Sequence, residues 1–176
     1  FCCILTACTA PSTEPGTTGN NTEKSEGSNS NKIIFAHLGG FTGDYAPYTE
    51  PEFEAAKLAV DEINNEGGVL GKTIEFLSED NQSTVEGAIS GFRKLVNTNN
   101  VTAIIGVESD GILALLEDAK ENQVPIIGQS AGTPELDTKG GDYVFRVAPS
   151  DSLNGKVSAQ VILEQGYDEI AIMVEN

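Results

Sequence analysis

The chain has 176 residues, and its 27 acidic residues outnumber its 10 basic ones, which gives a formal net charge of −17. This charge argues against nucleic-acid binding, because such a protein needs a basic face to displace the counterions of the phosphates. Hydrophobic residues make up 39% and charged residues 21%, a globular composition, and the single histidine leaves little room for a multi-histidine metal site.

The first eight residues, FCCILTAC, are apolar and contain all three cysteines. This segment is too short to span a bilayer and is typical of the end of a signal peptide. Its last four residues, Leu5 to Cys8, match the lipobox of prokaryotic lipoproteins, in which small residues suit the signal peptidase and the sulfur receives lipid. We therefore expect residues 1–8 to be a signal-peptide remnant and Cys8 to be the lipidated first residue of the mature protein.

Residues 9–31 consist almost entirely of Ser, Thr, Asn, Gly, Pro and Glu and show no apolar periodicity. Such a segment cannot bury enough surface to offset the entropy lost on ordering. The sequence therefore predicts a disordered tether that joins the lipid anchor to a folded body beginning at residue 32.

Strand and helix patterns alternate through that body. Short apolar runs predict strands, and amphipathic segments with capping or N-terminal proline signals predict helices. In chain order, the predicted elements are a strand at 33–38, a helix at 50–66, a strand at 73–77, a helix at 83–97, a strand at 101–105, a helix at 111–122, strands at 124–127 and 143–147, a helix at 152–165, and a strand at 169–174.

This alternation predicts an α/β fold, in which a Rossmann-like parallel sheet is flanked by helices. The apolar runs are continuous rather than alternating, which agrees with strands buried on both faces. The last strand pattern ends two residues before the chain does, which we interpret as a truncated C-terminus.

The loops after the predicted strands contain the candidate binding groups. In an open parallel sheet, ligands bind beyond the carboxyl ends of the strands, where the strand order reverses. The loops at 39–52, 106–111 and 128–134 offer hydroxyls, backbone amides and aromatic rings, which suit a small polar ligand.

Enzyme chemistry finds little support in these loops. No GxxxxGK[ST] or GxGxxG motif is present, and His37 lacks an evident Ser or Cys partner, so we interpret it as structural. The acids that follow the second and third strands, among them Asp80 and Glu108, are interpreted as solvated residues or helix caps rather than as a cation site. We expect no catalytic residues, no metal and no cofactor.

Several longer motifs resemble a known family. Residues 53–80, FEAAKLAVDEINNEGGVLGKTIEFLSED, together with TPEL at 133–136 and VFRVAPS at 144–150, are similar to the branched-chain amino acid-binding (leucine-binding-like) family of type I periplasmic solute-binding proteins of ABC transporters. The resemblance implies two Rossmann-like lobes that close over a ligand. Residues 32–149 would form the first lobe, and residues 150–176 the start of a truncated second lobe.

The resemblance also implies ligand-binding positions. Tyr48 falls where relatives place an aromatic side chain beside the ligand. The stretches that would grip the ligand's charged groups follow the third and fourth strands: Ser109, Asp110 and Gly111, and Ser130, Ala131, Gly132 and Thr133. Asp110 and Gly132 depart from the hydroxyl residues of the family pattern, which puts a standard leucine-type pose in doubt.

By this resemblance, the protein would be an extracytoplasmic, lipid-anchored solute-binding protein of an ABC importer. Its ligand would be an amino acid or a related small polar metabolite, and its partners would be the ABC permease and ATPase subunits. It would contact the membrane only through its lipid anchor. One alternative is a ligand-sensing module of a signalling or chemotaxis receptor system, and a weaker one is a small-molecule enzyme that uses acidic loop residues.

Overall fold

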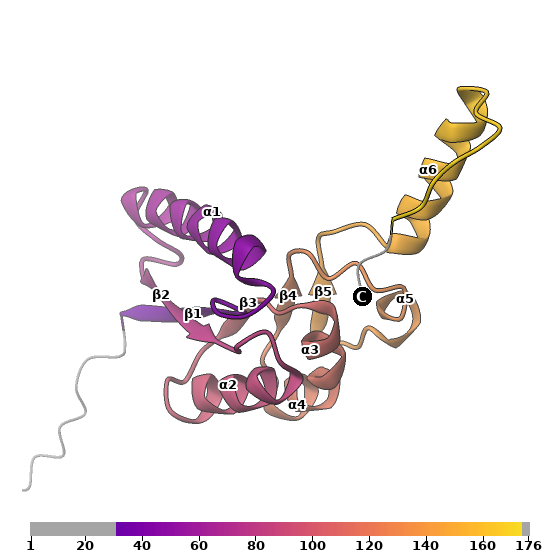
Figure 1. The fold of residues 1–176 in the computed structure, drawn as a ribbon. Coiled ribbons are helices and arrows are strands. Elements are labelled where there is room, and N and C mark those ends of the chain that lie inside the picture. The colour runs from indigo at the N-terminus through magenta and orange to yellow at the C-terminus, as the bar shows by residue number, and fades with distance from the viewer. Residues whose placement is uncertain (1–30, 174–176) are drawn as a thin grey trace, which may run out of the picture.

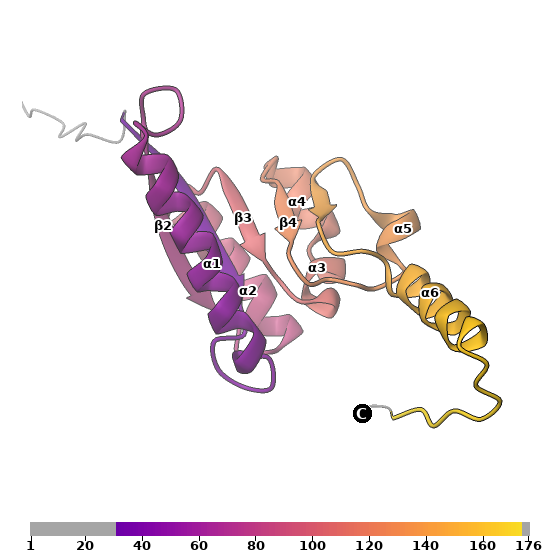
Figure 2. The ribbon, with the colours of Figure 1, turned by 90° about the horizontal axis from the view of Figure 1, so that it is seen from above.

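The computed structural model describes residues 31–173, which form a five-stranded parallel sheet with helices on both faces (Figures 1 and 2). The strand order is β2-β1-β3-β4-β5. The strands are β1 (Lys32–Gly39), β2 (Thr73–Asp80), β3 (Ala103–Gly106), β4 (Ile126–Gly128) and β5 (Val144–Arg146). The predicted α/β class with a parallel sheet is confirmed. Cys8 and nearly all of the predicted tether lie outside the described residues.

The helices cover the two faces unequally. They are α1 (Ala46–Asn65), α2 (Val85–Asn97), α3 (Ser109–Ala114), α4 (Leu116–Asn122), α5 (Leu136–Lys139) and α6 (Asp151–Glu164). Helix α1 lies on one face of the sheet, over β1 and β2, and α2, α3 and α4 lie on the other (Figure 1). Helix α6 projects away from the sheet, and nearly all of its residues are exposed.

Alternation along β1 directs neighbouring side chains to opposite faces of the sheet. Ala36 and Leu38 are fully buried in the hydrophobic core on the α2 side, where they pack with residues such as Phe92. The residue between them, His37, points to the opposite face, because successive strand side chains alternate. There its ring makes edge-to-face contact with Phe53 of α1.

Helix α1 begins earlier than the pattern predicted, at Ala46 rather than at residue 50, because Pro47 rather than Pro51 occupies its first turn. At its other end, the amide of Asn64 clamps β2. The Nδ2 of Asn64 donates to the carbonyl of Ile74 at 2.9 Å, and the backbone N–H of Ile74 donates to Oδ1 at 2.7 Å. These two bonds fix the C-terminal end of α1 against β2.

Other element boundaries also differ from prediction. The helix predicted at 111–122 is two short helices, α3 and α4, separated at Leu115. Helix α2 begins at Val85 rather than at residue 83, and it is capped by Thr84, whose hydroxyl accepts a hydrogen bond from the Gly87 N–H. The short α5 was not predicted.

The strand predicted at 169–174 is wrong for its described part, since residues 169–173 form no strand. A strand requires a neighbour for its backbone hydrogen bonds, and none of the sheet's five strands pairs with this segment. The side chains of Ile172 and Met173 are almost fully exposed. An apolar pattern alone was therefore insufficient to make a strand here.

Candidate functional site

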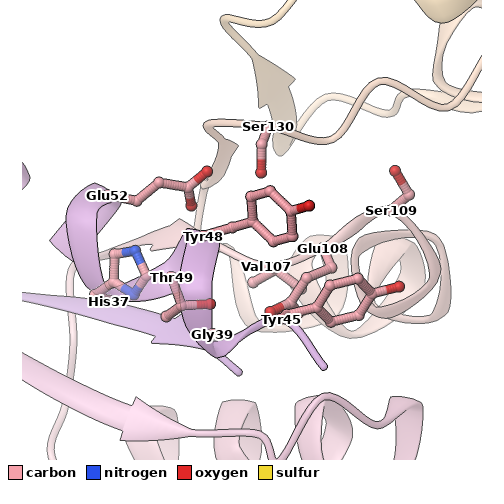
Figure 3. Close-up of a pocket in the computed structure, with 10 residues that line it drawn as sticks. All are labelled: His37, Gly39, Tyr45, Tyr48, Thr49, Glu52, Val107, Glu108, Ser109 and Ser130. Carbon is pink, nitrogen blue, oxygen red and sulfur yellow. The ribbon is translucent and has the colours of Figure 1, made fainter. Parts of the chain in front are cut away.

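A pocket of about 300 Å³ lies at the carboxyl ends of β1 and β3. In the sheet, β2 lies beside β1 on one side, and β4 lies beside β3 on the other. The strand order therefore reverses between β1 and β3. The residues that line it come from β1, the start of α1 and the loops after β3 and β4 (Figure 3): His37, Gly39, Tyr45, Tyr48, Thr49, Glu52, Val107, Glu108, Ser109 and Ser130.

One face of the first two turns of α1 supplies the aromatic part of the wall. Tyr45, Tyr48, Thr49 and Glu52 are spaced at i, i+3, i+4 and i+7, so they share one face of the helix. Tyr48 is 62% exposed, and its ring lies across the middle of the pocket in Figure 3. A ring in this position can pack against the apolar part of a ligand.

The turn that leads into α1 is fixed by Ser83. Its hydroxyl donates to the carbonyl of Thr42 at 2.7 Å and accepts from the N–H of Tyr45 at 3.0 Å. Gly43 adopts a positive φ of 85°, and a Cβ there would approach Ser83 to 2.8 Å, so this position requires glycine. The aromatic wall is therefore held by the loop that follows β2.

Asp80, the last residue of β2, also fixes the turn that leads into α1. It accepts hydrogen bonds from the hydroxyl of Thr42 at 2.7 Å and from the N–H of Gln82 at 2.8 Å. Burial acts to raise the pKa of Asp80, but these bonds and those from the Thr42 and Phe41 amides outweigh it and lower the pKa.

Glu108 ties the three strand ends together at the base of the pocket. Its carboxylate accepts from the backbone N–H of Gly40 at 2.6 Å and from Nδ2 of the buried Asn81 at 2.7 Å. A Cβ at Gly40 would lie 2.4 Å from the Ser83 hydroxyl, so only glycine allows this close approach. The acid predicted to be a solvated residue or helix cap is instead a cross-link between the loops after β1, β2 and β3.

His37 is the buried polar residue of the pocket. Its side chain is completely inaccessible to solvent, and its ring contacts Phe41 and Phe53 edge-on at centroid distances of 5.5 and 5.8 Å. Neither ring nitrogen has a hydrogen-bond partner among residues 31–173. Burial lowers the pKa of His37 from 6.5 to about 4, while the side chain of Gln129 and the charge of Glu108 act in the opposite direction. The ring is therefore neutral at physiological pH.

Three of the predicted ligand-binding residues, Tyr48, Ser109 and Ser130, line this pocket. Asp110 and Gly111 instead line an adjoining cavity of about 40 Å³, which they share with Tyr45 and the loop at 83–85.

The other three predicted residues lie away from both cavities. Ala131 is part of the hydrophobic core. A Cβ at Gly132 would collide with the carboxylate of Asp151. The carbonyl of Thr133 accepts a hydrogen bond from Arg146 at 2.8 Å.

Several residues of the pocket wall were not among the predicted ligand-binding positions: His37, Gly39, Tyr45, Thr49, Glu52, Val107 and Glu108. The helical spacing of Tyr45, Tyr48, Thr49 and Glu52 was the available signal, and it required the helix to begin at Ala46. The lining includes the acids Glu52 and Glu108 but neither Lys nor Arg.

Within the described part of the chain, no group of three or more His, Cys, Asp or Glu residues could hold a metal ion. The same residues contain no helix long and apolar enough to cross a membrane.

Residues 32–176 match the sequence model described as periplasmic binding protein. The leucine-specific-binding protein of Salmonella typhimurium is 29% identical over 141 residues, which cover 80% of this chain and 38% of that protein. The leucine-, isoleucine-, valine-, threonine- and alanine-binding protein of Pseudomonas aeruginosa is also 29% identical, over 143 residues, with the same coverage. The chain thus spans little more than a third of the length of these relatives.

A solved structure of a branched-chain amino acid transporter substrate-binding protein from Streptococcus pneumoniae, in complex with isoleucine, superposes with a TM-score of 0.72. It is 36% identical and covers 76% of this chain and 38% of its own. The matched proteins bind substrates and are not enzymes, which confirms that part of the sequence prediction.

Proposed function

The chain belongs to the periplasmic binding protein family, and we propose that it is the first lobe of an extracytoplasmic solute-binding protein of an ABC importer. Its ligand is an amino acid or a related small polar metabolite. The ligand binds in the pocket at the ends of β1 and β3 and is enclosed there by a second lobe.

The observation that carries this proposal is the pocket at the point where strand order reverses. Its volume of about 300 Å³ lies at the lower end of the range for small-molecule sites. Tyr48 offers an apolar surface, while Ser109 and Ser130 offer hydroxyls on other walls (Figure 3). This combination suits a ligand with an apolar part and polar ends.

The relatives support the ligand class. The matched proteins include those named for binding leucine, isoleucine and valine, and the Streptococcus pneumoniae structure contains isoleucine. An amino acid is consistent with the size of the pocket and its mixed lining. Tyr48, Ser109 and Ser130 are its proposed contacts on this lobe, and Asp110, Gly111 and residues 131–133 support them from the same loops.

The division into lobes belongs to the same proposal. Residues 32–149 form the first lobe, and residues 150–176 begin the second. Helix α6 supports this boundary, because apolar side chains such as Leu153, Val157 and Leu163 are more than half exposed. Such a helix needs a further layer to cover it, and the relatives are long enough to supply one.

Lipid anchoring through Cys8 and delivery to an ABC permease and its ATPase complete the proposed role. A Cys8→Ser variant expressed with its full signal peptide should move from the membrane fraction to the soluble fraction. Purified transporter in vesicles should hydrolyse ATP faster when the ligand-loaded binding protein is added. A soluble wild-type protein, or unchanged ATP hydrolysis, would contradict the corresponding part.

A thermal-shift panel of the full-length protein tests the binding role. Amino acids, polyamines, amides and small organic acids would be added in turn, and a true ligand raises the melting temperature by mass action. A Tyr48→Ala variant, altered at an exposed side chain, should keep the melting temperature of the unliganded protein and lose most of the ligand-induced shift. If no compound in the panel raises the melting temperature, the proposal fails.

A further inference from the structure

We propose that His37 and Glu52 form a polar end of the pocket that binds an N–H donor group on the side chain of the ligand. This inference rests on the proposed function and narrows its ligand class. The preferred ligand carries a side-chain amide or ammonium group rather than a purely aliphatic side chain.

The first observation is the unpaired state of the histidine. His37 is completely buried, lines the pocket, and leaves both ring nitrogens without a hydrogen-bond partner in the described part of the chain. Buried polar groups are nearly always hydrogen-bonded, because leaving one unpaired forfeits its interaction with water. A group that stays unpaired beside an open pocket is placed to be paired by whatever enters that pocket.

The second observation is the number of acceptors at this end. The neutral imidazole ring has one donor and one acceptor nitrogen. The Oε1 of Gln129 is a further acceptor that is buried without a hydrogen-bond partner among the described residues, and the carboxylate of Glu52, which also lines the pocket, accepts only. Acceptors therefore outnumber the single N–H of the His37 ring at this end of the pocket.

The third observation is position. In Figure 3, His37 and Glu52 lie on one side of the Tyr48 ring, and Ser109 lies on the other. A ligand held by Ser109 and packed against Tyr48 would therefore extend its side chain toward His37 and Glu52. No Lys or Arg is among the residues that line the pocket, so the carboxylate of Glu52 has no cationic partner there, whereas the carboxylate of Glu108 already accepts hydrogen bonds from Gly40 and Asn81.

The surroundings of His37 make a purely structural role insufficient. Phe41 and Phe53 contact its ring, and an apolar residue would pack there without leaving polar atoms unpaired. The close packing of His37 against Gly39 and Gly106, whose added Cβ atoms would approach its ring to about 3 Å, fixes the ring in place. A ring that is already fixed loses no further side-chain entropy when a ligand pairs with it.

The test is isothermal titration of the full-length protein with leucine, glutamine and lysine. The side chains of these probes end in an apolar, an amide and an ammonium group. We expect glutamine, lysine or both to bind more tightly than leucine, by about 10-fold or more, because leucine leaves the acceptors of His37 and Glu52 unpaired. Comparison of glutamine with lysine distinguishes a neutral donor from a cation.

Variants separate this end of the pocket from the rest. His37→Val should reduce the preference over leucine by about 10-fold, and His37→Gln, which keeps an acceptor, should restore part of it. Ser130→Ala is the matched control, because it removes a polar group from another wall and should weaken all three probes to a similar extent.

The outcomes distinguish this inference from the function on which it rests. Tighter binding of glutamine or lysine that His37→Val abolishes supports it. Tightest binding of leucine, or a preference that His37→Val leaves unchanged, overturns the inference while the binding function stands. Absence of binding by all three probes, and by the wider panel, overturns both.

Discussion

The buried histidine makes the stability of the protein depend on pH in a defined window. Its pKa is about 4 in the folded state, against 6.5 for an unperturbed histidine. Below pH 6.5 the unfolded chain binds a proton that the folded chain does not, so stability falls as the pH drops from 6.5 toward 4 and is unaffected above that range. Linkage of these two pKa values predicts a loss of about 2 kcal/mol between pH 7 and pH 5.

Urea denaturation of the full-length protein at pH 7, 6 and 5, followed by circular dichroism, measures this loss. A His37→Gln variant removes the titrating ring, while every carboxylate stays in place. Its stability should therefore fall by about 2 kcal/mol less than that of the wild type over the same range. Equal losses in the two proteins would refute the reasoning, and a larger loss in the variant would show that His37 is stabilised in its charged form.

Three further variants test other parts of the site. Glu108→Gln keeps the shape of the side chain but turns an N–H group toward either Gly40 or Asn81. Urea denaturation should therefore show a loss of about 2 kcal/mol in the free energy of unfolding. An unchanged midpoint would contradict the cross-link by Glu108. Asp80→Asn should cost about 1 kcal/mol at pH 7. Because the pKa of Asp80 is lowered, its contribution exists above the usual aspartate range and disappears as the pH falls through the folded-state pKa, so wild type and variant should converge in acid; a gap that persists there would contradict this. Asp110→Ser should change amino-acid affinity by less than about 3-fold in a titration, since Asp110 lines the adjoining cavity; a large gain for leucine would place it in the main pocket.

The fold class was predictable because local patterns in this chain agree with one another. Continuous apolar strands alternate with amphipathic helices, and the strand ends carry glycines such as Gly39 and Gly106. The strand order was not predictable in the same way, because pairing depends on contacts between segments far apart in sequence. His37, for example, is paired in register with both Ser78 and Ile105.

The site was only partly predictable for the same reason. Tyr48, Ser109 and Ser130 came from family position and line the pocket. Glu52 could not be assigned to the pocket from the sequence, because the helix was expected to begin at residue 50. Once α1 begins at Ala46, Glu52 shares a helix face with Tyr48 and points into the pocket.

His37 was interpreted as structural because the sequence showed no evident Ser or Cys partner for it. The sequence could not show the surroundings of its ring nitrogens. Only the structure shows that both ring nitrogens are buried beside a cavity, with no hydrogen-bond partner among the described residues. Similarly, the apolar run at 169–173 resembles a strand in sequence, but a strand also needs a neighbour that pairs with it.

A crystal structure of the full-length protein with the tightest-binding compound of the panel tests the central claim most directly. We expect the ligand to lie between two lobes, in the pocket lined by Tyr48, Ser109 and Ser130, with its side chain directed toward His37. A ligand bound elsewhere, or a second lobe that does not close over this pocket, would contradict it.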